Sequence, residues 1–285
     1  GGSAYDQMMA MKITADGGFI LAGYSASPIS GNKTQGDQGL NDFWIIKTDA
    51  SGVFQWDKTF GGTDEDKLYS VIQTSDGGYL LGGNTLSGIG GDKTQATQGL
   101  NDYWVVKTDA SGNKQWDKDF CGSAADEFTS LLQTPDGGYL LGGDSRSGIS
   151  GDKSQASLGL FDYWIIKINS SGTKVWDKDF GGNDNEQPFS SLSITNDNGF
   201  LLAGLSATGI NGDKTEANLG ALQTWVVKTN SLGVKQWDKT LLVNGNVQKG
   251  FALQSSDGCY LFADIANAPA GGDKTQASQG NDDYW

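Results

Sequence analysis

Short runs of apolar and polar residues follow one another along the chain without the 3.6-residue spacing of a helix. In residues 61–120, the runs at 68–74 and 102–109 are rich in β-branched and aromatic residues, and shorter runs lie at 79–81 and 114–120. Such runs are typical of short β-strands. The pattern therefore predicts four strands within this stretch.

Turn signals separate the predicted strands. An Asp-Gly-Gly at 76–78 lies between the first two, a Ser-Gly at 111–112 lies between the last two, and 87–101 is a long polar connection between the second and third. Asp and Gly favour tight turns because Gly tolerates positive φ and the Asp carboxylate binds backbone N–H groups two residues on. The long connection exceeds what a hairpin needs, so we expect it to be the main elaboration of the unit.

The same unit repeats along the chain. Asp-Gly-Gly, or a close variant, and Trp-Asp-Lys both recur at intervals of 60 or 61 residues. The first motif begins at Asp16, Asp76, Asp136, Asp197 and Asp257, and the second begins at Trp56, Trp116, Trp176 and Trp237. Two motifs that keep one phase define five copies. These copies span 1–60, 61–120, 121–180, 181–241 and 242–285.

We predict an all-β fold, a single β-propeller domain over residues 1–285 with four-stranded blades of about 60 residues. One blade buries little apolar surface by itself, so the blades must stack face to face. The first interpretation is five blades with the last incomplete, and the alternative is a fragment of a larger propeller. A parallel β-helix has a much shorter repeat, and a helical solenoid needs helical spacing.

Composition and charge narrow the possible functions. The 43 Gly residues recur at the turns and links of the repeat, which argues against a disordered chain. With 34 acidic and 20 basic residues the net charge is -14, which disfavours nucleic acid and anionic membranes as partners. The absence of His excludes a Ser-His-Asp triad, and no apolar run is long enough for membrane insertion. Because neither an initiating Met nor a leader begins the chain, we expect a mature or excised segment.

The repeat resembles a known group of proteins. The pattern DGGYLLGGNT, GDKTQ and GLNDYWVVKTDASGNKQWDKDF in residues 76–120 is similar to tandem-repeat propellers of secreted and cell-surface bacterial proteins. In outline it is also similar to the delta-60 repeat propellers. The resemblance covers the whole chain and implies an extracellular, modular β-propeller. It brings no catalytic residues.

Several recurring residues are expected to be structural. Asp76 and Asp136 should occupy the first position of their turns. The four Trp-Asp-Lys tryptophans are better explained by packing between blades than by stacking on sugars; these are Trp56, Trp116, Trp176 and Trp237. Three methionines in the first strand, at positions 8, 9 and 11, are expected to fill the core. Cys121 and Cys259 each replace a Gly of the repeat and are expected to be unpaired thiols.

The long loops and the third-strand starts supply the candidate ligand-binding residues. Propeller topology places them on one face of the ring, where ligands usually bind. The candidates are Asp92, Thr94, Asp102, Tyr103, Asp152, Asp162, Asp213 and Asp273. Among them, Asp92 with Asp102 and Asp152 with Asp162 supply oxygens suited to Ca²⁺, although two carboxylates per loop are few. The alternative is that Asp92 and Thr94 cap their own loop while Lys93 pairs with an acid. No other cofactor is expected.

The leading hypothesis for function is a non-catalytic propeller at the cell surface or outside the cell. It would serve adhesion, scaffolding or assembly, with a protein or glycan as partner. A lectin-like glycan-binding module is the second hypothesis. A glycosidase is the third, and we do not expect an enzyme because the carboxylates recur with the repeat whereas one substrate meets one site. The incomplete last copy also predicts an open strand edge that another chain can join.

Overall fold

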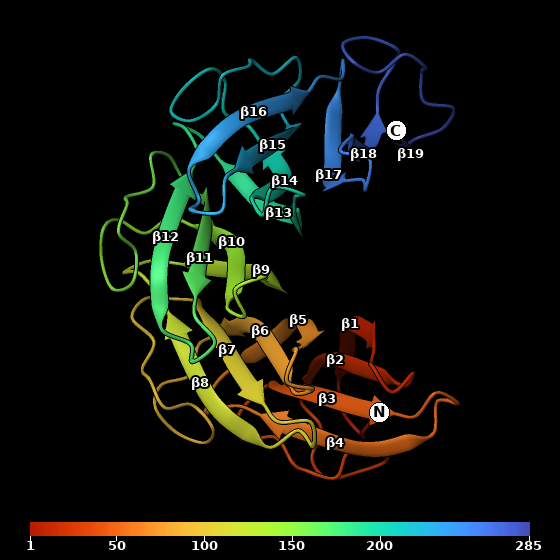
Figure 1. Cartoon of the computed structure of the whole chain (residues 1–285), viewed down its shortest axis with the longest axis vertical. Helices are drawn as coiled ribbons and strands as arrows, with labels where there is room; N and C mark the ends of the chain where they lie inside the picture. The colour runs from red at the N-terminus through yellow and green to blue at the C-terminus, as the bar shows by residue number, and fades with distance from the viewer.

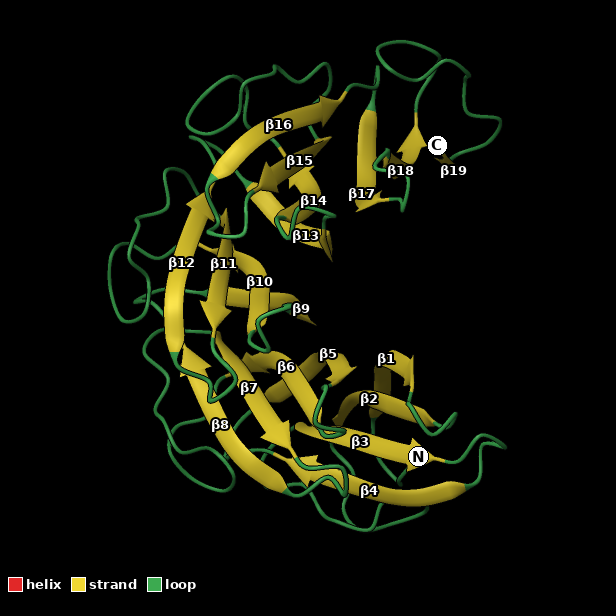
Figure 2. Ribbon diagram, viewed as in Figure 1, coloured by secondary structure: helices red, strands yellow, loops and turns green.

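The computed structural model describes the backbone of residues 1–285 and all side chains except those of residues 188–190. Its regular elements are nineteen β-strands, and no helix occurs in the described chain. None of the described segments is therefore a helix long and apolar enough to cross a membrane. Figure 2 shows the strands joined by turns and long loops.

The strands form five antiparallel sheets in chain order, which confirms the predicted all-β fold with four-stranded repeats and a partial fifth. Blade 1 contains β1 (Asp6–Ile13), β2 (Phe19–Ser25), β3 (Asp42–Thr48) and β4 (Phe54–Phe60). Blade 2 contains β5 (Asp66–Gln73), β6 (Tyr79–Thr85), β7 (Asp102–Thr108) and β8 (Lys114–Phe120). Blade 3 contains β9 (Asp126–Gln133), β10 (Tyr139–Ser145), β11 (Asp162–Ile168) and β12 (Lys174–Phe180). Blade 4 contains β13 (Glu186–Ile194), β14 (Phe200–Ser206), β15 (Gln223–Thr229) and β16 (Lys235–Leu241), and blade 5 contains β17 (Asn246–Gln254), β18 (Tyr260–Asn267) and β19 (Asp283–Tyr284).

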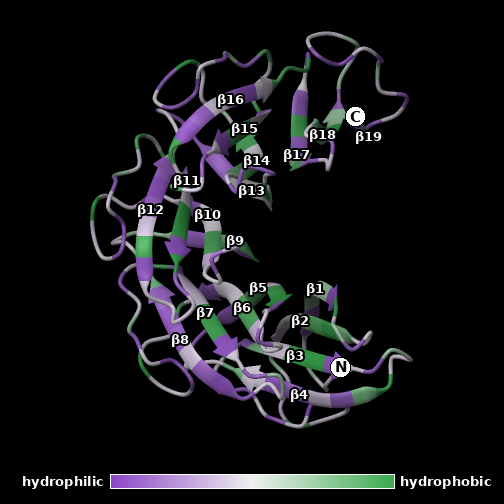
Figure 3. Cartoon of the chain, in the orientation of Figure 1, coloured by the Kyte–Doolittle hydropathy of each residue, from purple (hydrophilic) through white to green (hydrophobic). Residues whose placement is uncertain are grey.

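The blades stack side by side along an open arc, with the first strand of each blade on the inside and the fourth on the outside (Figure 1). Blades 1 and 5 lie at the two ends of the arc. Every residue of β7 and β11 is buried because each third strand is covered on both faces. In Figure 3, β3, β7 and β11 each show a hydrophobic stretch next to a hydrophilic one.

The core lies between blades. Ile20 and Phe43 on one face of blade 1 pack against Leu81 and Trp104 on the facing side of blade 2. The Phe43 and Trp104 ring centroids are 4.7 Å apart. Full burial of side chains of this size stabilises a fold by about 1.5–3 kcal/mol each, so the stacking of blades is the main source of stability.

The end face of blade 1 differs from the same face of blade 2. Met8 and Met11 are 62% and 54% exposed, whereas their counterparts Leu68 and Val71 are fully buried. The prediction that these methionines fill the core is therefore wrong. Inside the arc, the preceding blade covers this face of the first strand. In blade 1 the same face of β1 has no neighbouring blade.

In blades 1 to 4 the long loop is fastened to the outermost strand of its own blade. In blade 2, Thr94 donates hydrogen bonds from its backbone N–H (2.9 Å) and its hydroxyl (3.0 Å) to the Asp117 carboxylate. The Trp104 indole N–H donates to the same carboxylate at 3.3 Å, and Gln95 accepts from the Asp119 N–H at 3.0 Å. We call this set of contacts the loop latch. It holds the long loop against β8, and we expect it to restrict the motion of the loop despite its length.

Removing the latch carboxylate should loosen both loop and blade. Asp117 is 3% exposed and its loss leaves several donors without an acceptor. We expect Asp117→Ala to lower the free energy of unfolding by about 2–4 kcal/mol. Urea unfolding measures this, and limited proteolysis should show faster cleavage within residues 86–101. The matched control Asp282→Ala, at an exposed residue, should stay within about 0.5 kcal/mol; equal effects of the two variants would contradict the latch.

Candidate functional site

The predicted loop-face acids bind the backbone of the blade links. Asp92 accepts from the Gly61 N–H at 3.4 Å and from the Gln38 amide at 2.5 Å. Its counterparts bind the next links in the same way: Asp152 accepts from the Cys121 N–H (3.3 Å), Asp213 from the Gly181 N–H (3.3 Å) and Asp273 from the Leu242 N–H (2.9 Å). These carboxylates therefore tie each long loop to the link that enters its blade.

The remaining ligand candidates lie inside the protein or in the latch. Tyr103 is fully buried and its hydroxyl donates to the backbone carbonyl of Trp164 at 3.2 Å. Its predicted contact with a ligand is wrong, because its ring packs between blades 2 and 3. Asp102 and Asp162 are also fully buried and accept from the backbone of Gln98 (2.8 Å) and Leu158 (2.6 Å).

The acids proposed as calcium ligands are grouped differently from the prediction. Asp92 lies at the Gly61 link, whereas Asp102 lies one blade further along, at the Cys121 link. Asp152 lies at that same link. The structure therefore brings Asp102 together with Asp152 of the following copy, because the end of one blade meets the loop of the next. Calcium binding itself stays a prediction.

Buried carboxyl pairs occupy three consecutive blade junctions. Each joins the first residue of a third strand to the first residue of the next blade; the pairs are Asp42 with Asp66, Asp102 with Asp126, and Asp162 with Glu186. One oxygen of Asp42, of Asp102 and of Asp162 has no hydrogen-bond partner. Burial, and then the neighbouring Asp66, raise the pKa of Asp42 to about 7. At pH values below this, Asp42 is protonated in the folded protein.

The fourth junction replaces both acids by amides. Gln223 donates to the Gly245 carbonyl at 2.8 Å and accepts from the Val243 N–H at 2.7 Å. Asn246 stands at the start of the next blade and accepts from the Ala221 N–H at 3.0 Å. Both positions change together, which indicates that an acid at one position is coupled to an acid at the other.

The Asp42 pair should make stability depend on pH. An Asp in the unfolded chain has a pKa near 3.8, so the raised folded pKa stabilises the fold at low pH and this stability is lost as pH rises from about 4 to about 7. We expect Asp42→Asn to raise the free energy of unfolding by about 2–4 kcal/mol at pH 8 and to change it little at pH 4. Urea unfolding at both pH values tests this, with Asp282→Asn as the control. A variant effect that is the same at both pH values would contradict the assignment.

The Asp-Gly-Gly turns are structural ion-pair sites. Asp76 accepts from the Gly78 N–H at 3.0 Å and pairs with the buried Lys107 ammonium at 2.8 Å. Asp136 accepts likewise from Gly138 at 3.0 Å and pairs with Lys167 at 2.9 Å. The hydrogen bonds from Lys and Thr outweigh the effect of burial and lower the pKa of Asp76 and Asp136 to about 2. The lysine partners recur in the sequence as the Lys of YWVVK and its counterparts, and this repeated Lys is the signal from which the ion pair can be predicted.

The Trp-Asp-Lys tryptophans lie at blade contacts. Trp56 meets Tyr79 of the next blade edge to face with centroids 5.8 Å apart, and Trp237 meets Tyr260 at 5.0 Å. Trp116 packs on the core between blades 2 and 3, and Trp176 packs on the core between blades 3 and 4. None of the four is positioned as an open platform for a sugar ring.

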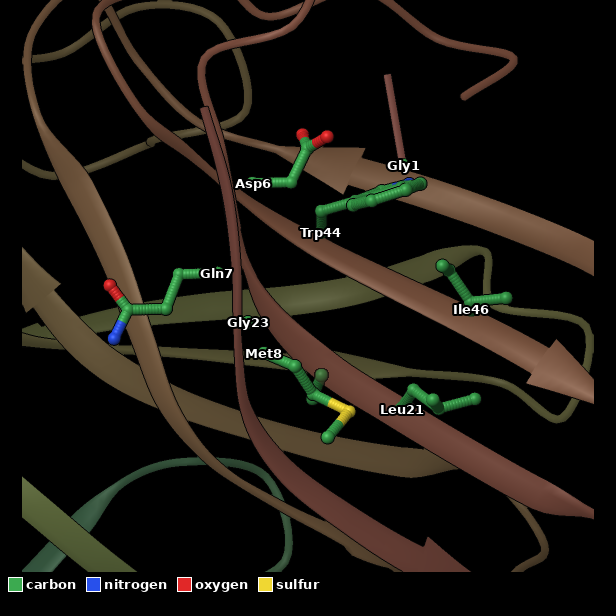
Figure 4. A pocket seen from close by; sticks show the side chains of 9 residues that line it. Gly1, Asp6, Gln7, Met8, Leu21, Gly23, Trp44 and Ile46 are labelled. Atoms are coloured by element: carbon green, nitrogen blue, oxygen red, sulfur yellow. The ribbon is translucent and has the colours of Figure 1, made fainter. Parts of the chain in front are cut away.

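A hollow of about 230 Å³ lies on the end face of blade 1 (Figure 4). Met8, Leu21, Trp44 and Ile46 line it together with Asp6 near the chain start. The residues at the equivalent positions of blade 2 are covered by blade 1. The hollow is therefore an uncovered blade-stacking face, and the loop face does not contribute to it.

The long loops of blades 1 to 4 each expose one isoleucine. Ile29, Ile89, Ile149 and Ile210 are 69%, 71%, 72% and 68% exposed. Each precedes a Gly with φ between 55° and 58°, which fixes the tight bend at the loop tip; these are Gly31, Gly91, Gly151 and Gly212. The repeated Ile was visible in the sequence, but the pattern could not show that it points into solvent.

Comparisons with known proteins found only distant similarity. No protein-family model matches the sequence. The regulatory protein FlaEY of Caulobacter vibrioides is 24% identical over 166 residues, which are 55% of this chain. The matched region is 17% of the length of FlaEY.

Solved structures with a similar arrangement have low sequence identity. A protein from Dyadobacter fermentans is 10% identical, with 93% of this chain and 76% of that chain covered and a TM-score of 0.49. The GH43_1 enzyme from Xanthomonas citri in complex with xylotriose is 10% identical, with 92% and 82% covered and a TM-score of 0.43. CoXyl43, a GH43 β-xylosidase/α-arabinofuranosidase from a compost metagenome, is 13% identical, with 91% and 94% covered and a TM-score of 0.40.

Proposed function

We propose that this protein is a non-catalytic display scaffold at the cell surface or outside the cell, which binds a protein or glycan through repeated loop tips. The observation that supports the proposal most is the set of four exposed isoleucines, each held on a latched loop in the same way. Rigid loops lose little conformational freedom when they bind. Several equal weak contacts on one rigid body suit a partner that is itself repetitive.

The polar residues of the loops support the same interpretation. Asp92 and Thr94, expected as ligand contacts, are used inside the protein to hold the loop. The exposed side chains of the loops include both apolar and polar groups. Leu40, Leu100 and Leu160 are exposed eleven residues after the isoleucines, and polar residues such as Gln95 and Gln98 are exposed between them. The loop face therefore offers apolar contacts and neutral hydrogen-bonding groups to a partner.

A lectin-like module is the second candidate for the same face. Apolar side chains at loop tips also contact the less polar faces of sugar rings, so the chemistry of the tips does not separate a protein partner from a glycan. A glycan array probed with and without Ca²⁺ separates them. Binding to a defined glycan on the array supports the lectin, and binding only to protein-coated surfaces supports the scaffold.

A glycosidase is the third candidate, and one acid pair is relevant to it. Asp144 lies opposite Glu127 in the sheet of blade 3, and the other copies lack this pair of acids. Burial, and then Glu127, raise the pKa of Asp144 well above its usual range, as a general acid requires. Asp144 is only 2% exposed, however, so a sugar does not reach it in this conformation. Turnover of a xylan-type or arabinan-type substrate that Asp144→Asn abolishes would favour the enzyme.

The scaffold predicts that binding depends on the loop isoleucines together. We expect one Ile→Thr substitution to lower retention on a polymeric partner by less than tenfold, and all four together to lower it about 100-fold or more. The measurement uses microspheres coated with the full chain on immobilised polysaccharides and on cell-surface protein extracts. The matched control is Val53→Thr with Val175→Thr, at exposed residues on the opposite face. Equal retention of the fourfold variant and the wild type would exclude the loop tips as the binding surface.

Assembly is a further role that the ends of the arc favour. Leu261 and Tyr284 of blade 5 are 55% and 90% exposed, whereas their counterparts Ile20 and Phe43 are fully buried against a following blade. Blade 5 thus presents one half of a blade contact, and blade 1 presents the other. Along β18, β19 pairs with Ile265 and Ala266, and Trp285 exchanges two backbone hydrogen bonds with Asp264. We propose that a second copy of the chain covers these faces head to tail.

Head-to-tail association should depend on concentration. Analytical ultracentrifugation of the full chain is expected to show dimers and longer species that Met8→Asp and Leu261→Asp each abolish, because a charge cannot be buried in the contact without a partner. Ile29→Asp, on the loop face, should leave association unchanged. A chain that stays monomeric at high concentration would contradict the proposal.

A further inference from the structure

The junction between blades 2 and 3 contains a group of ligand-type side chains that the other junctions lack. Asp102 ends its loop at the start of β7, Asp119 lies near the end of β8, and Cys121 lies in the link that follows. A carboxylate oxygen of each Asp and the Cys121 sulfur all lie within 4.8 Å of one another. The three residues are 0%, 4% and 2% exposed.

Two carboxylate oxygens in this group have no hydrogen-bond partner. Asp102 uses its Oδ2 to accept from the Gln98 N–H at 2.8 Å, and Asp119 uses its Oδ2 to pair with the buried Lys93 ammonium. The Oδ1 atoms of both residues are buried without a partner. A buried carboxylate oxygen that no donor satisfies is costly, so its persistence at two adjacent residues points to a ligand that supplies positive charge.

The surrounding charges fit one divalent cation. Lys93 is the ammonium nearest to the group and it neutralises a single carboxylate. A divalent cation together with Lys93 would balance the two carboxylates and a thiolate, and the Asp152 carboxylate would add one further negative charge. A fourth donor atom is near, because Asp152 Oδ2 lies 3.8 Å from the Cys121 sulfur and Asp152 is partly exposed. The three residues and Asp152 therefore offer four donor atoms, as a four-coordinate ion requires.

We propose that Asp102, Asp119 and Cys121 bind one Zn²⁺ ion at the junction of blades 2 and 3, with Asp152 as the fourth ligand. Zn²⁺ accepts thiolate sulfur and carboxylate oxygen in tetrahedral sites, whereas Ca²⁺ and Mg²⁺ prefer oxygen ligands alone. Binding forms a Zn–S bond and releases the thiol proton to solvent. The ion would join a third strand, a fourth strand, a link and a loop, and so cross-link two blades.

The other junctions provide natural comparisons. The positions of Asp119 and Cys121 are Thr59 and Gly61 one copy earlier, and Thr240 and Leu242 two copies later. The intervening junction has Asp179 but Gly181. Only the junction of blades 2 and 3, among those of the described structure, therefore combines both carboxylates with a sulfur. Cys121 or Asp119 can therefore be replaced by the residue that stands at the same position in another copy of the repeat. Such a substitution removes one ligand and introduces a side chain that the fold already accommodates.

The test measures Zn²⁺ bound to the full chain. The protein is stripped with a chelator, dialysed against ZnCl₂ and analysed for metal, and a parallel titration with CoCl₂ monitors the absorption band of a thiolate–cobalt bond. We expect about one Zn²⁺ per wild-type chain, the cobalt–thiolate band, and a higher thermal midpoint with the metal. Cys121→Gly and Asp119→Thr should each weaken binding about 100-fold or more.

Cys259→Gly is the matched control, because Cys259 is the other free thiol, is exposed, and also replaces a Gly of the repeat. It should bind Zn²⁺ like the wild type. Circular dichroism and unfolding curves check that each variant is folded. If Cys121→Gly does not fold, Cys121→Ser is used in its place. The proposal is overturned if the wild type binds no Zn²⁺, if Cys121→Gly keeps the ion, or if the cobalt–thiolate band disappears with Cys259→Gly.

Discussion

Face-to-face packing of one blade on the next is the interaction on which the rest of the structure depends. The sheets inside the arc are hydrophobic on both faces, so a blade gains most of its stability from packing against its neighbours. The contact between Phe43 and Trp104 shows how an aromatic residue of one third strand meets the Trp of the next. The same requirement explains the ends of the arc, where the faces of blade 1 and blade 5 stay apolar and exposed.

Charged residues are placed around this packing. The stacked core leaves little room for water at the junctions, so the polar groups there must satisfy one another. Polar groups within the blades are paired as well: the loop latch joins Thr94 to Asp117, and in blades 1 to 4 the Asp of the first turn pairs with a buried Lys, such as Asp76 with Lys107. The carboxyl pairs are the exception, because oxygens of Asp42, Asp102 and Asp162 lack partners. These junctions are where protonation or a cation can change the stability of the fold.

The repeat made the fold predictable, because motifs that recur every 60 residues place strands, turns and links without knowledge of distant contacts. Asp76 shows the same for a local site, since its turn depends on residues two positions away. Contacts between copies were not predictable in this way. Tyr103 looked accessible beside a polar loop, but the neighbouring blade buries it. Asp92 and Asp102 looked like one loop's ligand pair, but the stacking of blades sends them to different junctions.

The central claim is that the long loops are rigid parts of their blades and hold the exposed isoleucines in fixed positions. Hydrogen exchange of the loop amides tests this most directly. The account predicts that the amide hydrogens of Thr94 and Thr215, which bind Asp117 and Asp238, exchange about as slowly as those of the neighbouring strands. Exchange of these amides at the rate of an unstructured peptide would contradict the claim, because the loops would then be mobile and the isoleucines would have no fixed arrangement.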